Sequence, residues 1–380
     1  MNEDGSTRLS VRSLAIVAFF LIPLALSVLA FARRSQTIFR APVPIQRPFN
    51  STHPGPPRVA VCFWGVNRAL PHTVASIDKN IFGALEEHFV EYDVFFHTYS
   101  LLNVTSAWAE ENGVAVPGAA DELRRFQARK HLARYEVTNQ DDFDLMSDWK
   151  SYKVPQWGHR WTQDVILNVL RSTFSLHRVT ALWQLEVAER PRCYSQVLYL
   201  RPDLHYMTTL NVPQLLSAGD YDFLTPNWGQ YRGINDRLGA GGLKAARAFG
   251  SRSLLAHAYG QRRPFHPESF ARWSLDREGV NLGFFCLCGV RERSDGRVLK
   301  DDCTKGKNHL GLPSAPCDEF DGQAVTRVDY PNTKEAAAEN PSRNRRRRRG
   351  VAGRSRAAMR TSIAAHEPRR GRRSEIRSKG

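Results

Sequence analysis

The chain lacks the cysteine spacing of a zinc or redox site. It contains no CxxC pair, and Cys286 and Cys288 are separated by one residue, so in a strand their side chains would point to opposite faces. This spacing argues against a zinc ribbon, a zinc finger or a thioredoxin-type motif. The even number of cysteines instead fits one to three disulfides in an oxidising compartment: Cys62, Cys193, Cys286, Cys288, Cys303 and Cys317. No internal repeat is visible either.

The body of the chain has little net charge. Residues 331–380 hold 16 Lys or Arg against 4 Asp or Glu, which accounts for +12 of the net charge of +16. This tail has almost no large apolar residue, so we expect it to be disordered. It is either a nuclear-localisation or polyanion-binding patch, or a solvated appendage without a specific partner. Its basic residues lack interleaved aromatics for base stacking, which argues against nucleic acid as the main partner.

Residues 13–32 contain no charged residue and are numerous enough to cross a hydrocarbon core as a helix. They follow a short N-terminal tail, 1–12, and precede a proline-rich stretch, 33–57, that reads as an extended stem. We therefore predict a membrane anchor, although Ala30-Phe31-Ala32 would also suit signal-peptide cleavage after Ala32. Arginines on both sides leave the orientation open, and their count leans against a cytoplasmic N-terminus.

Other features favour a lumenal body. Asn50 and Asn103 each begin an acceptor sequence for N-glycosylation, and the cysteines fit an oxidising lumen. We therefore predict a single-pass type II membrane protein whose residues 58–330 form the folded body. That length suits one large α/β domain.

The apolar pattern of the body predicts alternating strands and helices. A strand at 59–64, an amphipathic helix at 71–88 and a strand at 93–98 form a βαβ unit, which implies parallel strands. The glycine-rich residues 239–242 are interpreted as a turn, and 294–296 as a hairpin. Further helices are expected at 121–135, at 162–190 with a break near 172–175, at 243–259 and at 267–277, and further strands at 197–200, 221–224 and 280–285.

The run Val197-Leu198-Tyr199-Leu200-Arg201-Pro202-Asp203 is the most informative local pattern. Four apolar residues predict a central strand buried on both faces, and Pro202 ends it because proline cannot donate to a sheet ladder. Asp203 is then expected beyond the packed part of the strand, at the carboxyl edge where open α/β sheets bind ligands. Its carboxylate either holds a divalent cation against nucleotide phosphates or caps the next turn.

Several segments together resemble the GT-A glycosyltransferases, particularly the lipopolysaccharide- and capsule-type enzymes and their eukaryotic type II membrane relatives. The similarity spans 58–302, and its specificity comes from the order and spacing of motifs that are individually weak. The matching residues are Gly65-Val66-Asn67-Arg68, Asp93-Val94-Phe95-Phe96-His97, Ser175, Arg201-Pro202-Asp203, Asn235-Asp236-Arg237 with Gly239, His266-Pro267-Glu268, and Val290-Arg291 with Asp295-Gly296.

The resemblance implies a GT-A, Rossmann-like α/β fold with a mixed, mostly parallel sheet between helices. It also implies a nucleotide-sugar donor, a glycan or glycoconjugate acceptor, and a Golgi (or ER) setting. The Asp-x-Asp motif of the family is here Arg201-Pro202-Asp203, which leaves one carboxylate and puts a tightly bound Mn²⁺ in doubt. Asp203 remains the candidate ligand of Mn²⁺ or Mg²⁺. Arg201 would supply fixed positive charge to the diphosphate.

The other candidate site residues each have a simpler explanation. Arg68 would reach the nucleotide from the loop after the first strand, or is an exposed loop arginine. Asp236 is a candidate catalytic residue, as a base or a sugar contact, or an Asx-turn residue. Glu268 is the second catalytic candidate, or a carboxylate favoured by its helix dipole. We expect His97 to be a hydrogen-bonded core residue.

The leading hypothesis is a membrane-anchored glycosyltransferase. Two alternatives from other classes stay open at this point. One is a catalytically inactive GT-A-like carbohydrate-binding protein, because a single carboxylate remains in the central motif. The other is a polyanion- or nucleic-acid-binding protein that acts through the arginine-rich tail.

Overall fold

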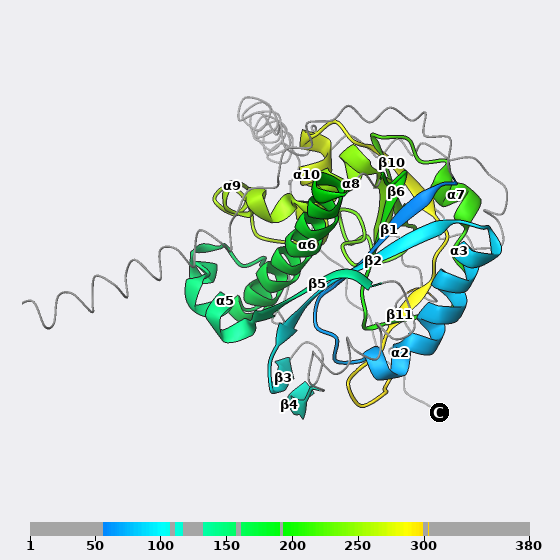
Figure 1. Ribbon diagram of the computed structural model, residues 1–380. Coiled ribbons are helices and arrows are strands. Elements are labelled where there is room, and N and C mark those ends of the chain that lie inside the picture. The colour runs from blue at the N-terminus through cyan, green and yellow to red at the C-terminus, as the bar shows by residue number, and fades with distance from the viewer. Residues whose placement is uncertain are drawn as a thin grey trace, which may run out of the picture. The chain divides into compact units, whose positions relative to one another are not determined.

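The computed structural model describes residues 56–106, 111–116, 132–156, 161–190, 193–298 and 303. They form three layers, with a twisted sheet between two sets of helices (Figure 1). The helices are α2 (Leu70–Ile77), α3 (Gly83–Glu87), α5 (Gln140–Met146), α6 (Gln163–Glu189), α7 (Val212–Leu216), α8 (Leu243–Gly250), α9 (Ala256–Gly260) and α10 (Pro267–Arg277), with a π turn η1 (Asp78–Phe82) and 3₁₀ turns η3 (Trp149–Ser151) and η4 (Arg252–Leu255).

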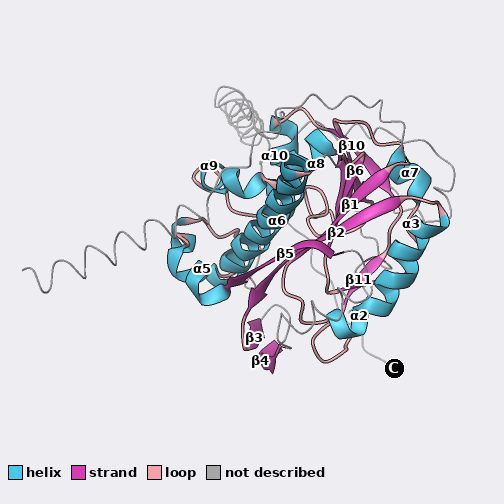
Figure 2. Ribbon diagram, in the orientation of Figure 1, coloured by secondary structure: helices cyan, strands magenta, loops and turns pink. Residues whose placement is uncertain are grey.

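The main sheet has the strand order β10-β8-β9-β6-β1-β2-β5. Only β9 runs antiparallel to its neighbours in this sheet, so the other six strands have their carboxyl ends at one edge. Figure 2 shows the strands between the helices. The strands are β1 (Arg58–Trp64), β2 (Glu91–Ser100), β3 (Asn103–Ser106), β4 (Glu111–Ala115), β5 (Leu132–Asn139), β6 (Gln196–Leu200), β7 (Leu204–Tyr206), β8 (Asp222–Pro226), β9 (Gly239–Gly242), β10 (Asn281–Phe285) and β11 (Gly289–Arg291).

The alternating side chains of the buried central strands face two different cores. On β6, Leu198 and Leu200 pack in one cluster with residues of α2, η1, α3 and α7. Tyr199 points to the opposite face, where its hydroxyl contacts Thr180 at 2.9 Å and Trp183 at 3.1 Å on α6. Both faces of the strand are therefore buried, which explains why its sequence is a continuous apolar run.

The predicted βαβ unit is confirmed. β1 and β2 pair in parallel, with Val61 opposite Val94, and the chain between them forms α2, η1 and α3. The predicted hairpin near 294–296 is also present: Arg293 N–H donates to the carbonyl of Arg297 and Gly296 N–H donates to that of Arg293, each at 2.9 Å.

The predicted break in the long helix is wrong. α6 continues through 172–175 because the hydroxyl groups of Thr173 and Ser175, which could compete for backbone hydrogen bonds, form contacts that leave the helix intact. Thr173 donates back to the carbonyl of Val169 at 3.0 Å. Ser175 donates to the carbonyl of His97 at 3.2 Å and accepts from Gly65 N–H at 2.8 Å, so it joins the helix to β1 and β2.

Two further expectations are corrected. The end of the helix predicted at 121–135 is in fact the start of β5, which pairs with β2 and forms ion pairs to α6 through Arg134 and Glu136. The expected glycine turn at 239–242 is the strand β9. Glycine is required there because a Cβ at Gly241 would lie 2.5 Å from the carbonyl oxygen of Asp222 on β8.

Within the described ranges, no helix combines the length and apolar character that crossing a bilayer requires. The predicted anchor 13–32, the basic tail 331–380 and most of the predicted stem 33–57 lie outside the described residues.

Candidate active site

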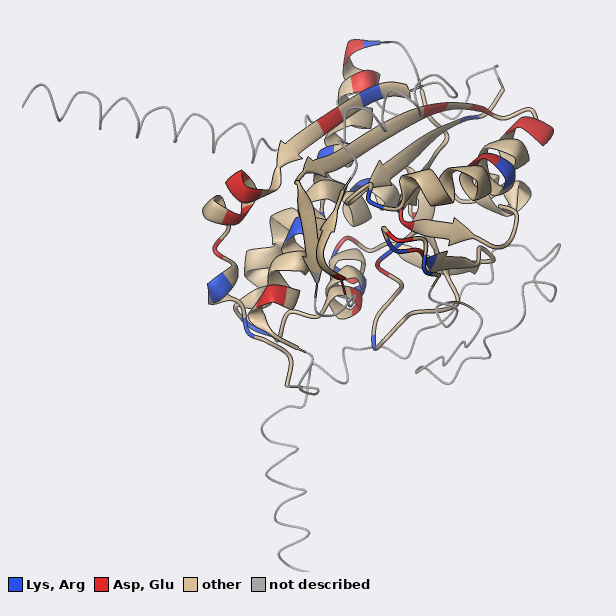
Figure 3. Ribbon diagram, turned by 90° about the horizontal axis from the view of Figure 1, so that it is seen from below, with Lys and Arg blue, Asp and Glu red and all other residues tan. Residues whose placement is uncertain are grey.

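The candidate site residues lie in loops at the carboxyl edge of the main sheet. The loop 65–68 follows β1, Arg201 to Asp203 follow β6, and 236–238 lead into the antiparallel strand β9. Basic and acidic segments lie close together in the middle of the domain in the view of Figure 3. The topology therefore brings together side chains that are far apart in the sequence.

Asp203 is fully buried, which corrects the expectation that it lies outside the packed part of the strand. Arg201 binds it with two parallel hydrogen bonds, Nε to Oδ1 and Nη2 to Oδ2, each 2.7 Å long. Burial works to raise the pKa of Asp203, but the charges of Arg201 and Arg68 outweigh it and hold that pKa far below its ordinary value. The carboxyl is therefore ionised and already neutralised by arginine.

Arg68 is not an exposed loop arginine, since only 11% of its side chain is exposed. Its guanidinium donates to Glu111 Oε2 at 2.6 Å and to Asp203 Oδ2 at 3.4 Å. Glu111, at the start of β4, also accepts from the Ser294 hydroxyl at 3.0 Å. Sequence reasoning missed Glu111 because nothing in its local pattern points to Arg68, which is 43 residues away.

The residues present do not fit a divalent cation at Asp203. Both of its oxygens accept from guanidinium groups, so a cation bound there would lie beside two positive charges with a single carboxylate to offset them. Within the described part of the chain, no group of three His, Cys, Asp or Glu side chains is arranged to hold a metal ion.

Asp236 and Glu268, predicted separately from two motifs, lie within electrostatic range of each other. Glu268 is 6% exposed, and burial together with the charge of Asp236 raises its pKa well above the ordinary value. The pKa of Arg201 is raised too: burial lowers it, but Asp203 and Asp236 outweigh that effect. Asp236 therefore links the acidic pair to the arginines beside β6.

Close backbone packing positions Asp236 against Glu268. Ile234 N–H donates to the carbonyl of Glu268 at 3.2 Å, in the first turn of α10. A Cβ at Gly233 would lie only 1.9 Å from that carbonyl oxygen, so the contact requires glycine. Asn235 closes the loop by accepting from Arg237 N–H at 2.9 Å, so the residue that makes the side-chain contact of the turn is Asn235 and not Asp236, for which it was predicted.

Two basic side chains enclose the acidic pair. His266 Nε2 lies 3.4 Å from Glu268 Oε2, and burial lowers the pKa of His266 to about 4, so the imidazole is neutral at pH 7. Arg252 is 1% exposed, and its Nη2 donates to the carbonyl of Asp236 at 3.4 Å. Burial lowers the pKa of Arg252 to about 10, so it remains a cation near both carboxyl groups. Sequence reasoning did not single out Arg252.

His97 is a core residue, as expected. It is fully buried, with Nδ1 2.7 Å from the Ser175 hydroxyl and Nε2 2.9 Å from the Thr138 hydroxyl. Burial lowers its pKa well below the ordinary value, so it is neutral. It has a structural role, which is to hold β2 against α6.

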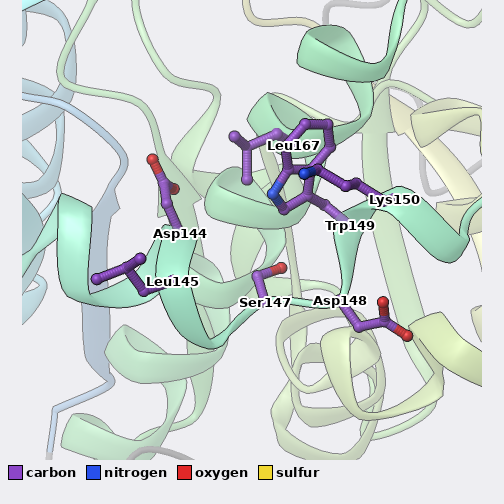
Figure 4. A pocket seen from close by; sticks show the side chains of 7 residues that line it. All are labelled: Asp144, Leu145, Ser147, Asp148, Trp149, Lys150 and Leu167. Carbon is purple, nitrogen blue, oxygen red and sulfur yellow. The ribbon is translucent and has the colours of Figure 1, made fainter.

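A separate hollow of about 450 Å³ lies between α5, η3 and the first turns of α6. Trp149, Lys150, Asp144 and Leu167 line it (Figure 4). None of the predicted site residues contributes to it. The segments that form it, α5 and η3, come after the edge strand β5, whereas the charged loops follow the interior strands β1 and β6. The hollow is therefore separate from the charged loops.

No family model and no curated protein matches the chain. Among solved structures it is similar to galactosyltransferase LgtC in complex with donor and acceptor sugar analogs, at 12% identity and a TM-score of 0.33, over 60% of this chain and 73% of that one. Glycosyltransferase GlyE of Streptococcus pneumoniae TIGR4 gives 9% and 0.33 over 60% and 45% of the two chains. Mouse xyloside xylosyltransferase 1 gives 11% and 0.29 over 60% and 82%.

Proposed function

We propose that this chain is a glycosyltransferase that moves a sugar from a nucleotide-sugar donor to a glycan or glycoconjugate acceptor. The observation that carries the proposal is the acidic pair Asp236 and Glu268 beside the arginines at the end of β6. Glycosyl transfer needs both parts, because a diphosphate must leave as an anion while an acceptor hydroxyl loses its proton.

In the proposed reaction, the acceptor oxygen forms a bond to the anomeric carbon of the donor. The bond between that carbon and the phosphate oxygen breaks, and its electron pair leaves with the nucleoside diphosphate. The hydroxyl proton passes to Asp236, the more accessible carboxyl group of the pair. Glu268, whose raised pKa keeps it protonated at higher pH than an ordinary glutamic acid, donates a hydrogen bond within the site.

The test uses purified full-length protein and a panel of nucleotide sugars, with release of the nucleoside diphosphate as the signal. Asp236→Asn removes the proton acceptor and keeps the size of the side chain, so we expect kcat to fall by about 10²- to 10⁴-fold. Asp164→Asn is the matched control, because Asp164 is exposed in the first turn of α6. Equal rates for wild type and Asp236→Asn would contradict the proposed role of Asp236.

Turnover also separates this proposal from the inactive alternative. A protein that is stabilised by a nucleotide sugar against heat but releases no product with any donor or acceptor would be a binding protein. The single carboxylate in Arg201-Pro202-Asp203 is the observation that keeps this alternative open.

We further propose that the enzyme is a single-pass type II protein of the Golgi or ER, anchored by residues 13–32. Two observations support a lumenal body. Cys288 and Cys303 form a disulfide, and Cys286 is disulfide-bonded as well. Asn103, the first residue of β3, is exposed and thus open to glycosylation. Endoglycosidase treatment of protein made in animal cells should lower its mass, and part of that shift should disappear in Asn103→Gln.

A further inference from the structure

Arg293 is a buried cation that forms no side-chain hydrogen bond or ion pair with the described residues. It is 3% exposed and lies in the hairpin that follows β11. Among the described residues, no hydrogen bond or ion pair involves its guanidinium, and its Nε is buried and unsatisfied. Buried polar groups in folded proteins are almost always paired, so a guanidinium without a partner among the described residues is a candidate site for a bound anion.

Arg293 lies beside the other arginines of the site. Glu292 N–H donates to the carbonyl of Asp203 at 2.9 Å, and Ser294 N–H donates to Glu111 Oε1 at 3.4 Å, so both neighbours of Arg293 bind the Asp203 cluster. Burial and the positive charges of Arg68 and Arg291 lower the pKa of Arg293 to about 10, although Asp203 and Glu111 act to raise it. Arg293 therefore belongs to the group of charged side chains around Asp203.

The charge balance of the cluster favours an anion. Arg293 lies within electrostatic range of two other cations, Arg68 and Arg291, and of two carboxylates, Asp203 and Glu111. Both carboxylates already accept hydrogen bonds from Arg68 or Arg201, so among the described residues Arg293 is the cation of this group that is left to bind an anion. Guanidinium groups bind phosphate oxygens in pairs, with a geometry that a carboxylate or a phosphate can match.

We infer that Arg293, together with Arg68 and Arg201, binds the diphosphate of the donor directly and that no divalent cation is required. Asp203 then acts as a positioning residue that fixes the plane of the Arg201 guanidinium, and Glu111 does the same for Arg68. Arginine stabilises the leaving diphosphate in the place where a metal ion would do so. The inference rests on the proposed function, since it assigns the site that holds the donor.

The test measures binding of inorganic pyrophosphate to the full-length protein by calorimetry in EDTA. Pyrophosphate contains the diphosphate group that nucleoside-diphosphate sugars have in common, and it lacks their base and sugar. Wild type should bind it, and Arg293→Met should bind about 10- to 100-fold more weakly because a charge-assisted contact is lost. The matched control, Arg247→Met on the exposed end of α8, should bind like wild type. Arg293→Lys should fall between them, since it keeps the charge without the planar fork.

A thermal melt without ligand distinguishes this role from a structural one. Removing an unpaired buried cation should leave the melting temperature unchanged or raise it, whereas removing a structural arginine should lower it. Binding that appears only when Mn²⁺ replaces EDTA, equal binding by Arg293→Met and wild type, or a large loss of stability in both Arg293 variants would each overturn the inference.

The two proposals can fail separately. Pyrophosphate binding that depends on Arg293, with no turnover of any nucleotide sugar, would keep the anion site and reject the transferase. Sugar transfer that requires Mn²⁺ and is unaffected by Arg293→Met would keep the transferase and reject the arginine site.

Discussion

Replacing Asp203 with asparagine should strongly destabilise the fold. The substitution keeps the size of the side chain but removes the charge that Arg201 contacts at 2.7 Å through two nitrogen atoms. Each charge-assisted hydrogen bond contributes about 1.5–3 kcal/mol. Breaking a buried ion pair from one side costs about 3–5 kcal/mol, because the partner charge stays buried and uncompensated. For a domain of this size, that lowers the melting temperature by roughly 6–20 °C.

Asp295 provides a matched control in the same chain. It also pairs with an arginine two residues away, Arg297, at 2.6 Å, but both side chains are about half exposed. Asp295→Asn should therefore unfold like wild type within error, because water screens an exposed pair. The two variants make the same chemical change and differ in burial.

The pH dependence gives a second readout. The pKa of Asp203 is held below its unfolded value of 3.8, so its contribution is fully present above pH 3.8 and is lost as pH falls further. The stability difference between wild type and Asp203→Asn should therefore shrink in acid, as measured by urea denaturation at several pH values. Equal stability of the two proteins at pH 7 would refute this account of the ion pair.

Two further predictions concern the acidic pair. Gly233→Ala should cost at least about 3 kcal/mol in urea denaturation, or abolish transfer while the fold survives, because the added methyl group overlaps the backbone of Glu268. A normal rate and normal stability would contradict the packing described for this loop. Glu268→Gln should match wild-type stability near pH 4.5 and exceed it increasingly as pH rises. The pKa of Glu268 is raised in the fold, so the wild type loses stability above the unfolded value of 4.5 and the variant does not. Parallel stability curves for the two proteins would show that Glu268 does not titrate as described.

The parts of the fold that the sequence predicts are those in which local pattern and tertiary packing agree. The run before Pro202 is apolar because both faces of β6 are covered, so its pattern alone predicts a buried strand. By contrast, β5 lies at the edge of the sheet, and its alternating exposure comes from pairing with β2 and from ion pairs to α6. These contacts join residues that are far apart in the sequence, so the local pattern of β5 does not predict them.

The candidate site divides in the same way. Asp203, Asp236 and Glu268 stand in recognisable motifs, but the contact of Gly233 with the first turn of α10 that brings the last two together is visible only in space. Glu111 and Arg293 follow no motif. They enter the site because the β4 strand and the hairpin after β11 both reach the loop of Arg68.

The position of β9 has a consequence for the order of folding. In the described sheet, β8 and β10 are joined to β6 only through this antiparallel strand. β8 and β9 are near neighbours in the chain, whereas β6 and β9 are about forty residues apart, so the shorter loop should close first. Until the second closure, β6 presents an unpaired apolar edge on which another chain can dock. We therefore expect the slow step of folding, and the exposure to misassembly, to lie in the insertion of four small residues into the centre of the sheet.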